Sequence, residues 1–225
     1  MTLSPRALPE SFFARDTVTV ARELLGCVLV SNEGGVVTSG RIVETEAYLG
    51  TDDAGSHAAT KGITARNAVM YGPPGRVYVY FTYGNHNMLN VVTEHEGVAG
   101  AVLIRALEPL EGVGEMERRR SAGRRDGHPP RLCDLTNGPG KLASALGIGL
   151  DTNGSVLDGS ATLSVLAAQA GERGGDAVAT SGRIGLSSGH EAELRFYFEG
   201  NEYVSKASPG PRRAHKLRAT ERHET

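Results

Sequence analysis

The spacing of apolar residues divides the chain into one early helix followed mostly by short strands. In residues 15–26, RDTVTVARELLG, valines and leucines recur at helical spacing and form an apolar stripe. Asp16 before this stripe can cap a helix, and Gly26 after it can end one. The sequence therefore predicts a helix between these two residues.

Segments rich in β-branched and aromatic residues predict an extensive sheet. Most of these segments follow one another with only a turn between them, and helical patterns are few. This succession favours an antiparallel or mixed sheet with flanking helices, the α+β class, over a repeating βαβ fold. No break in composition marks a second domain, so one domain is expected. The predicted strand segments are 27–49 with a turn near 32–35, 76–94 with a turn near 84–85, 100–107, 161–166, 182–186 and 192–200.

Three further stretches connect or flank these strands. Residues 51–75 are polar, show little periodicity, and are expected to form a long loop of a kind that is often functional. Residues 114–125 predict a helix, and residues 135–149 predict a turn and a short helix that stops at Gly147. The NGPGK sequence at 137–141 would present backbone N–H groups and a lysine to an anion, although its spacing is not that of a Walker loop.

Composition narrows the class of protein without naming its partner. The chain has 225 residues, 39% of them apolar, and a formal net charge of −2. It has no apolar run of about 18 residues and no signal-peptide core, so a cytoplasmic protein without a membrane span is expected. Basic residues gather in 116–131 and 206–222, which either bind phosphate or form a solvated helix face and a flexible tail. Cys27 and Cys133 lie far apart and outside any metal-binding pattern, so reduced thiols and no metal site are expected.

Two glutamates interrupt the segment 40–50, GRIVETEAYLG, where a strand is predicted. Because alternate side chains of a strand share a face, Glu44, Glu46 and Tyr48 point one way. The other set, which ends at Leu49, is expected to face the core. One interpretation of the glutamates is a solvent-exposed sheet face. The other is a cleft in which a carboxylate activates water beside an aromatic ring, and periodicity does not decide which glutamate would do so.

The predicted hairpin at 76–94 is rich in tyrosine. Four of the seven tyrosines in the chain lie between positions 71 and 83. Such rings can pack across strands, or they can sandwich a flat heterocycle. Tyr83, next to the turn at Gly84, is poorly placed for the core but well placed to wedge into stacked bases.

Three other polar residues stand out by their context. His57 follows the glutamates in the long loop, although a lone histidine is more often incidental than functional. Asn90 lies on the return strand of the hairpin, where asparagine is disfavoured, so its amide is a candidate for a specific contact. Arg105 interrupts the apolar strand AVLIRAL and therefore needs a carboxylate or phosphate partner.

Several segments, in order along the chain, resemble the alkyladenine (3-methyladenine) DNA glycosylase family. They are GRIVETEAYLG, SH, ARN, PGRVYVYFTYGNHNMLNVV, VLIRALEPLEG, LTNGPGKL, SGRIGL and LRFYFEG. The combination of ETEAYLG, YVYFTYG and RALEP is far more specific than any one short motif. The resemblance implies a single α+β glycosylase domain over 1–204, with a curved, mainly antiparallel sheet and a DNA-inserting hairpin. Residues 205–225 are expected to form a flexible basic C-terminal tail.

The resemblance also implies the reaction. Alkylated or deaminated purines such as 3-methyladenine, hypoxanthine and ethenoadenine would be flipped out of duplex DNA and released by hydrolysis, which initiates base-excision repair. Glu46 would be the general base that activates the water attacking C1′ of the sugar. Arg105, together with a backbone carbonyl near Ile184, would hold that water. No cofactor and no catalytic metal are implied, and the pocket motifs hold no lysine, so no lyase step is expected.

Recognition of the base is assigned in the same way. Tyr48, His57 and Tyr80 would line the pocket and stack on the flipped base. Asn90 would lie at the pocket floor and exclude the exocyclic amino group of guanine. Tyr83 would enter the minor groove and fill the gap left by the extruded nucleotide.

Two features depart from the family and bear on the partner. The hairpin tip YGNHNML is more polar than is usual for the family, and the chain is less basic than expected for a duplex binder. DNA binding by a monomer, at the nucleoid in the cytoplasm, should then rest on the two basic runs. A non-catalytic nucleic-acid-binding module of the same fold is the main alternative, although it has no reason to aim Glu46 at a phosphodiester. A nucleoside hydrolase is a second alternative, although it needs neither Tyr83 nor basic flanks.

Overall fold

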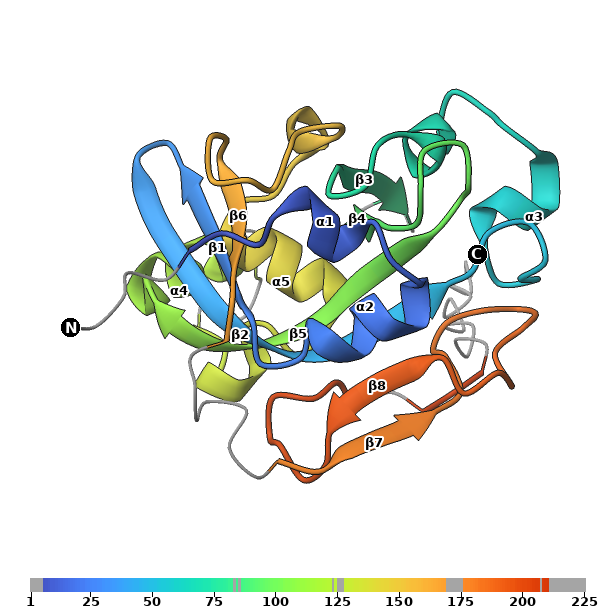
Figure 1. Cartoon of the computed structure of the whole chain (residues 1–225). Helices are drawn as coiled ribbons and strands as arrows, with labels where there is room; N and C mark the ends of the chain where they lie inside the picture. The colour runs from blue at the N-terminus through green and yellow to red at the C-terminus, as the bar shows by residue number, and fades with distance from the viewer. Residues whose placement is uncertain are drawn as a thin grey trace, which may run out of the picture.

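The strands form one curled antiparallel sheet. The computed structural model describes residues 6–82, 84, 86–122, 124, 128–168, 176–206 and 208–210. Over these residues eight strands curl into a half-barrel around a few helices (Figure 1). The main order is β3-β4-β5-β2-β1-β6, and β8 pairs with β2 and β7. This arrangement confirms the predicted α+β class and the single compact domain.

The elements alternate irregularly along the chain. The strands are β1 (Val28–Glu33), β2 (Val36–Tyr48), β3 (Val77–Thr82), β4 (His86–Val92), β5 (Ala101–Glu111), β6 (Leu163–Leu166), β7 (Val178–Ser181) and β8 (Arg195–Phe198). The α-helices are α1 (Glu10–Phe13), α2 (Thr17–Glu23), α3 (His57–Lys61), α4 (Val113–Ser121) and α5 (Pro139–Leu146). Short 3₁₀ helices are η1 (Ala68–Tyr71), η2 (Leu132–Asp134) and η3 (Leu150–Thr152).

Local sequence accounts for the start of the fold. Asp16 caps α2 as predicted, because its Oδ1 accepts the backbone N–H of Thr19 at 2.8 Å. The turn between β1 and β2 consists of Gly34 and Gly35, whose φ angles are +63° and +79°. Two successive left-handed residues suit the twist of a tight hairpin, and glycine adopts them without steric cost.

The core lies in the hollow of the sheet. Helix α2 packs against β2 and β5, and α5 packs against β4, β5 and α4. Apolar side chains from both helices and from the strands join one buried cluster. The hydrophobic stripes of the two helices are thus covered by the sheet, as an amphipathic helix requires. No helix of the described residues is long and apolar enough to cross a membrane.

Strand β2 is the centre of the sheet and carries both glutamates. One edge pairs with β5, while the other pairs with β1 as far as Arg41 and with β8 from Glu44 to Glu46. Register shifts on either side of Glu44 mark bulges in the pairing with β5. Bulges bend and twist a strand. We therefore attribute the change of partner from β1 to β8 to this irregular stretch.

The second half of β2 is enclosed on both faces. Glu44 and Glu46 are both 0% exposed, so the interpretation of a solvent-exposed sheet face is wrong. Leu49, expected in the core, is 42% exposed because it follows the end of the strand at Tyr48. Burial of two carboxylates requires partners that compensate the lost hydration.

The C-terminal part differs from the predicted strand pattern. Residues 182–186, predicted as a strand, are irregular, and β7 lies just before them. Gly185 has φ +81°, which breaks an extended run, and Ile184 makes only an isolated bridge, to Gly210. The boundary expected before Ser205 falls within packed structure, since that residue is buried. The rest of the expected tail, 211–225, lies outside the described residues.

Candidate active site

Two adjoining cavities open where β2, β3, β4 and the loops after β2 and β7 meet. The larger has a volume of about 270 Å³, and the smaller, about 40 Å³, shares Tyr48, His57 and Tyr80 with it. The larger cavity is lined by Tyr48, Ala54, Gly55, Ser56, His57, Tyr80, Thr82, Met88, Leu103, Arg105, Pro139, Ile184, Gly185, Leu186, Ser187 and Ser188. The smaller cavity adds Met70, Tyr78, Asn90 and Ala101. The lining combines aromatic and apolar side chains with polar groups that could orient a small molecule.

Glu46 lies directly behind this lining. Its Oε1 accepts the backbone N–H of Ile184 at 2.8 Å, and its Oε2 accepts the hydroxyl of Tyr48 at 2.8 Å. Nη1 of Arg105 lies 3.1 Å from the same Oε2. All three donors line the larger cavity, so the carboxylate is held by groups that also form the cavity wall. The contact of Ile184 with Glu46 is made by its N–H, and the role of a nearby backbone carbonyl in holding the water stays a prediction.

Arg105 joins the two glutamates of β2. Its Nε donates to Oε1 of Glu44 at 2.8 Å, which provides the carboxylate partner that its place in an apolar strand required. Burial lowers the pKa of Arg105, but the charges of Glu46 and Glu44 outweigh it, and the net pKa is raised. Burial raises the pKa of Glu44, but Arg105 and Arg195 outweigh it and lower the net pKa. Glu44 and Arg105 therefore keep their charges at neutral pH.

Aromatic rings form the wall shared by the two cavities. The ring centroids of His57 and Tyr80 lie 4.6 Å apart, and those of Tyr78 and Tyr80 lie 5.4 Å apart. Nδ1 of His57 is 3.0 Å from the hydroxyl of Tyr78. Tyr78 was not among the predicted site residues. Its only signal was its alternation with Tyr80 on one strand face, which is equally typical of cross-strand packing.

The side chains of Tyr48, Tyr78 and His57 are neutral at physiological pH. Burial raises the pKa of Tyr78 to about 12 and holds that of Tyr48 well above its usual range. Burial and the nearby guanidinium of Arg66 lower the pKa of His57. That guanidinium lies 5.3 Å from the ring centroid of Tyr80. The cavity thus offers neutral, electron-rich faces to a bound heterocycle.

Asn90 lines the smaller cavity and is 3% exposed. Its Nδ2 donates to the backbone carbonyls of Tyr78 at 3.1 Å and Met88 at 3.3 Å. These bonds fix the orientation of the amide. They also provide hydrogen-bond partners for a residue type that is disfavoured in strands. The lining of the smaller cavity therefore includes a polar group whose orientation is fixed.

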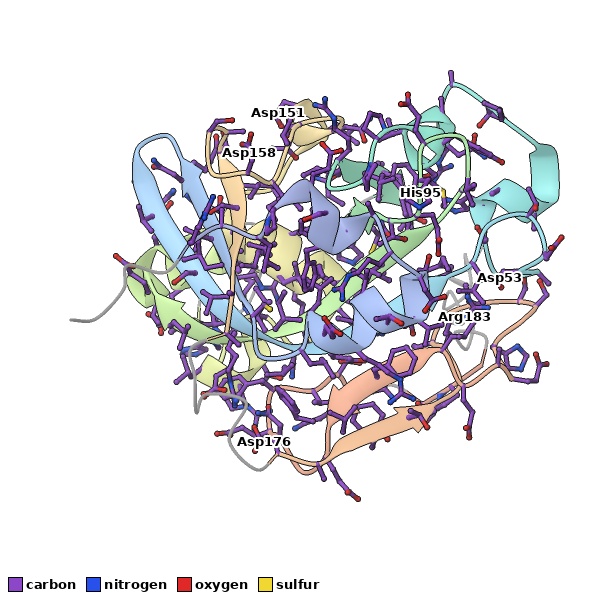
Figure 2. All side chains as sticks on the ribbon, viewed as in Figure 1. Asp53, His95, Asp151, Asp158, Asp176 and Arg183 are labelled. Carbon is purple, nitrogen blue, oxygen red and sulfur yellow. The ribbon has the colours of Figure 1, made fainter. Side chains whose placement is uncertain are left out.

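A buried ion pair behind Tyr48 was not predicted. Arg183, 0% exposed, bonds through both terminal nitrogens to the carboxylate of Asp53 (Figure 2). Its Nη1 and Nη2 also donate to the carbonyls of Ala47 and Gly189 at 2.9 and 2.8 Å. Burial raises the pKa of Asp53, but Arg183 and backbone N–H groups outweigh it, and the net pKa is lowered. The pair joins the loop after β2 to the loop after β7. In the sequence, the only indication of this pair was that each of the two loops contains charged residues.

The predicted DNA-binding elements are described only in part. Tyr83 and Asn85 lie outside the described residues. The ring of His86 lies against Gly140 in the first turn of α5. The contact is so close that a Cβ atom at Gly140 would lie 2.7 Å from Cγ of His86. In the first basic run, Arg118 pairs with Glu115. Most of the second run, 206–222, lies outside the described residues.

Lys141, the lysine of the predicted anion site, is bonded to a neighbouring side chain, and the described residues form no metal-binding group. At the predicted anion site, Nζ of Lys141 donates to Oδ1 of Asn137. Pro139, at the first turn of the same helix, lines the larger cavity. Within the described ranges, no group of three or more His, Cys, Asp or Glu side chains is placed to hold a metal ion.

Comparison with known proteins identifies the class of this fold and site. The sequence model of the methylpurine-DNA glycosylase family matches residues 11–202. A relative from Prosthecochloris aestuarii is 46% identical over 201 residues, which are 89% of this chain and 91% of the relative. One from Chlorobaculum parvum is 44% identical over 218 residues, 96% of this chain and 99% of the relative. One from Methanoculleus marisnigri is 46% identical over 199 residues, 88% of this chain and 98% of the relative. All three are named for 3-methyladenine DNA glycosylase activity.

These matches place the chain in the class of DNA glycosylases, which are hydrolases that cleave N-glycosidic bonds. The chain belongs to the methylpurine-DNA glycosylase family.

Proposed function

We propose that this protein is a monofunctional glycosylase that removes 3-methyladenine, hypoxanthine and ethenoadenine from duplex DNA. The observation that carries the proposal is the placement of Glu46. Its carboxylate is excluded from bulk solvent and is held by three donors that also line an aromatic cavity. A carboxylate directly behind the wall of a cavity that received a flat heterocycle could act on the bond that joins the base to its sugar.

Glu46 would act on both the sugar and the attacking water. Cleavage of the glycosidic bond builds positive charge on the sugar, and a nearby carboxylate stabilises that charge. The same carboxylate can take a proton from the water that attacks C1′. Arg105 and the N–H of Ile184 would hold the carboxylate in one orientation, and Arg105, at the cavity wall, would also contact the water.

The aromatic wall would select the base. A base inside a duplex hides its glycosidic bond, so the nucleotide must be flipped out at a cost of a few kcal/mol. Tyr48, His57 and Tyr80 would receive the flipped base by stacking. Alkylated purines such as 3-methyladenine are cationic, and neutral aromatic rings attract a cation by about 0.5–2 kcal/mol beyond stacking. The neutral state of Tyr48 and His57 supports a preference for such lesions.

Discrimination against guanine would come from the cavity floor. The amide of Asn90 is held by two backbone carbonyls and cannot move aside without breaking these bonds. A base with an additional exocyclic amino group would therefore meet a fixed obstacle. We assign this exclusion to Asn90, and we assign to Tyr83 the filling of the space vacated in the duplex.

Hydrolysis without strand cleavage is part of the proposal. A lyase step requires an amine that forms a Schiff base with the sugar. Among the described residues that line the two cavities, none is a lysine. The product would therefore be an intact abasic site.

Two other functions share parts of this arrangement. A non-catalytic DNA-binding module would not need a buried carboxylate at the cavity wall, because a negative charge repels phosphate. A nucleoside hydrolase would use such a carboxylate but would act on free nucleosides. Substrate form therefore separates the proposed function from both alternatives.

The test uses duplex oligonucleotides that each carry one lesion, with the corresponding free nucleosides in parallel. The parental protein should excise the base only from DNA and leave alkali-labile abasic sites. Glu46→Gln should bind lesion duplex as the parent does but excise at least about 100-fold more slowly, because general-base catalysis typically contributes this much. Glu108→Gln, which changes a carboxylate paired with Arg41 away from the cavities, is the matched control and should excise normally. Parental rates in Glu46→Gln would overturn the assignment.

A further inference from the structure

The chain continues into the site beyond the end of the family match. The match ends at residue 202, and Ser205 lies three residues further on, with 8% of its surface exposed. Its backbone N–H donates to Oε2 of Glu44 at 2.7 Å, and its Oγ donates to Oε1 at 2.7 Å. One residue near the C-terminus thus bonds to both oxygens of a fully buried carboxylate.

Glu44 passes this contact on to Arg105. Its Oε1 also accepts Nε of Arg105 at 2.8 Å and Nε of Arg195 at 2.7 Å. The opposite side of the Arg105 guanidinium lies 3.1 Å from Glu46. The guanidinium is therefore held between two carboxylates, and the orientation of one of them depends on Ser205.

Gly210, shortly after Ser205 in the chain, contacts the backbone around Ile184, whose N–H also holds Glu46. Gly210 makes an isolated parallel bridge with Ile184, and its carbonyl accepts the N–H of Gly185 at 2.9 Å. The N–H of Gly210 donates to the carbonyl of Arg183 at 3.2 Å. Ile184 lies between these two bonded positions and donates its own N–H to Glu46. Both the guanidinium and the amide that hold Glu46 are thus backed by residues from this stretch.

We propose that Ser205 and Glu44 are positioning residues for catalysis, which set the guanidinium of Arg105 against Glu46. Neither needs to touch DNA, because both are buried. The guanidinium of arginine is planar and has five donors, so its orientation is set by acceptors that are themselves fixed. If one acceptor turns, the guanidinium turns away from the other acceptor as well. This inference rests on the proposed function of Glu46 and adds a requirement on how its partner is held.

The test compares three full-length variants in single-turnover excision and in lesion-duplex binding. Ser205→Ala removes the hydroxyl donor but keeps the N–H bond to Glu44, and it should lower the excision rate about 10- to 100-fold with unchanged affinity. Ser205→Thr keeps the hydroxyl and should restore the rate to within about threefold. Ser31→Ala is the matched control, because Ser31 is also buried and donates to a backbone carbonyl, that of Leu146, away from the cavities.

Glu44→Gln gives an independent readout of the same arrangement. It preserves shape but removes the charge that holds Arg105, so the excision rate should fall at least as far as in Ser205→Ala, again without loss of binding. Thermal unfolding of every variant separates loss of stability from loss of rate. Equal excision by Ser205→Ala and Ser31→Ala would overturn the inference, as would a loss in Ser205→Ala that threonine does not restore. Parental protein that excises no lesion would instead overturn the proposed function itself.

Discussion

The guanidinium of Arg183 lies 4.8 Å from the centroid of the Tyr48 ring, whose hydroxyl donates to Glu46. Arg183 is itself fixed by Asp53, 130 positions earlier in the chain. The orientation of the ring therefore depends on an ion pair between two loops. Tyr48 connects this pair to the carboxylate of Glu46, so a disturbance of the loops should reach the proposed reaction centre.

Replacement of Arg183 by lysine should test that dependence. Lysine keeps the charge but cannot form the paired bonds to Asp53 and the bonds to two carbonyls at once. We expect the free energy of unfolding to fall by about 2 kcal/mol and excision to slow, because Tyr48 loses its backing. Urea unfolding and single-turnover excision measure the two effects. Arg118→Lys, at a side chain that is 71% exposed, should change neither, and equal effects of both substitutions would contradict the interpretation.

Acid should weaken the same ion pair within a defined pH window. The pKa of Asp53 in the folded protein lies below its ordinary value of 3.8. The stability that ionised Asp53 contributes is therefore fully present above about pH 4 and is lost as pH falls through the lowered pKa. The difference in unfolding free energy between the parent and Asp53→Asn should be constant from pH 7 to 5 and should shrink below pH 4. Unfolding curves at a series of pH values measure it, and a gap that does not close on acidification would refute this account.

Removal of an aromatic face should affect charged lesions most. Tyr80→Leu keeps apolar bulk but removes the π system that lies 4.6 Å from the ring of His57. Excision of cationic 3-methyladenine should fall about 2- to 30-fold more than excision of neutral hypoxanthine, which corresponds to the loss of a cation–π contribution. Tyr80→Phe retains the ring and should preserve the ratio. Parallel losses on both lesions in Tyr80→Leu would show that the ring acts through packing alone.

Tyr83→Ala should weaken the capture of lesions in duplex DNA. Stacking between a base and an aromatic side chain typically contributes about 1–3 kcal/mol, so affinity for lesion duplex should fall roughly tenfold. Affinity for undamaged duplex should change less, because no nucleotide is flipped there. Competition binding with matched lesion and undamaged duplexes measures the ratio. An unchanged ratio would remove Tyr83 from the proposed mechanism.

Features that depend on neighbouring residues could be predicted from the sequence, and features that depend on distant partners could not. Asp16, Gly34 and Gly35 act within a few residues of themselves, so local chemistry was enough to predict α2 and the turn between β1 and β2, whereas α1 was not predicted. Residues 182–186 have a strand-like composition, but Gly185 and the contact of Ile184 with Glu46 make them a loop. That outcome depends on a partner 138 positions away, which no local pattern contains.

The sequence by itself determined the α+β class, the glycine turn of the first hairpin and the set of polar and aromatic residues that a family resemblance singles out. The resemblance named Glu46, but only the tertiary structure gave the physical difference between Glu44, held by Arg105, Arg195 and Ser205, and Glu46, which is held by groups that line the cavity. The two carboxylates are equivalent in strand periodicity, and they differ because β5, β8 and the C-terminal loops surround them differently. The physical reason is that a buried charge is defined by its partners, and in this chain those partners are brought together from distant positions by the folding of the sheet.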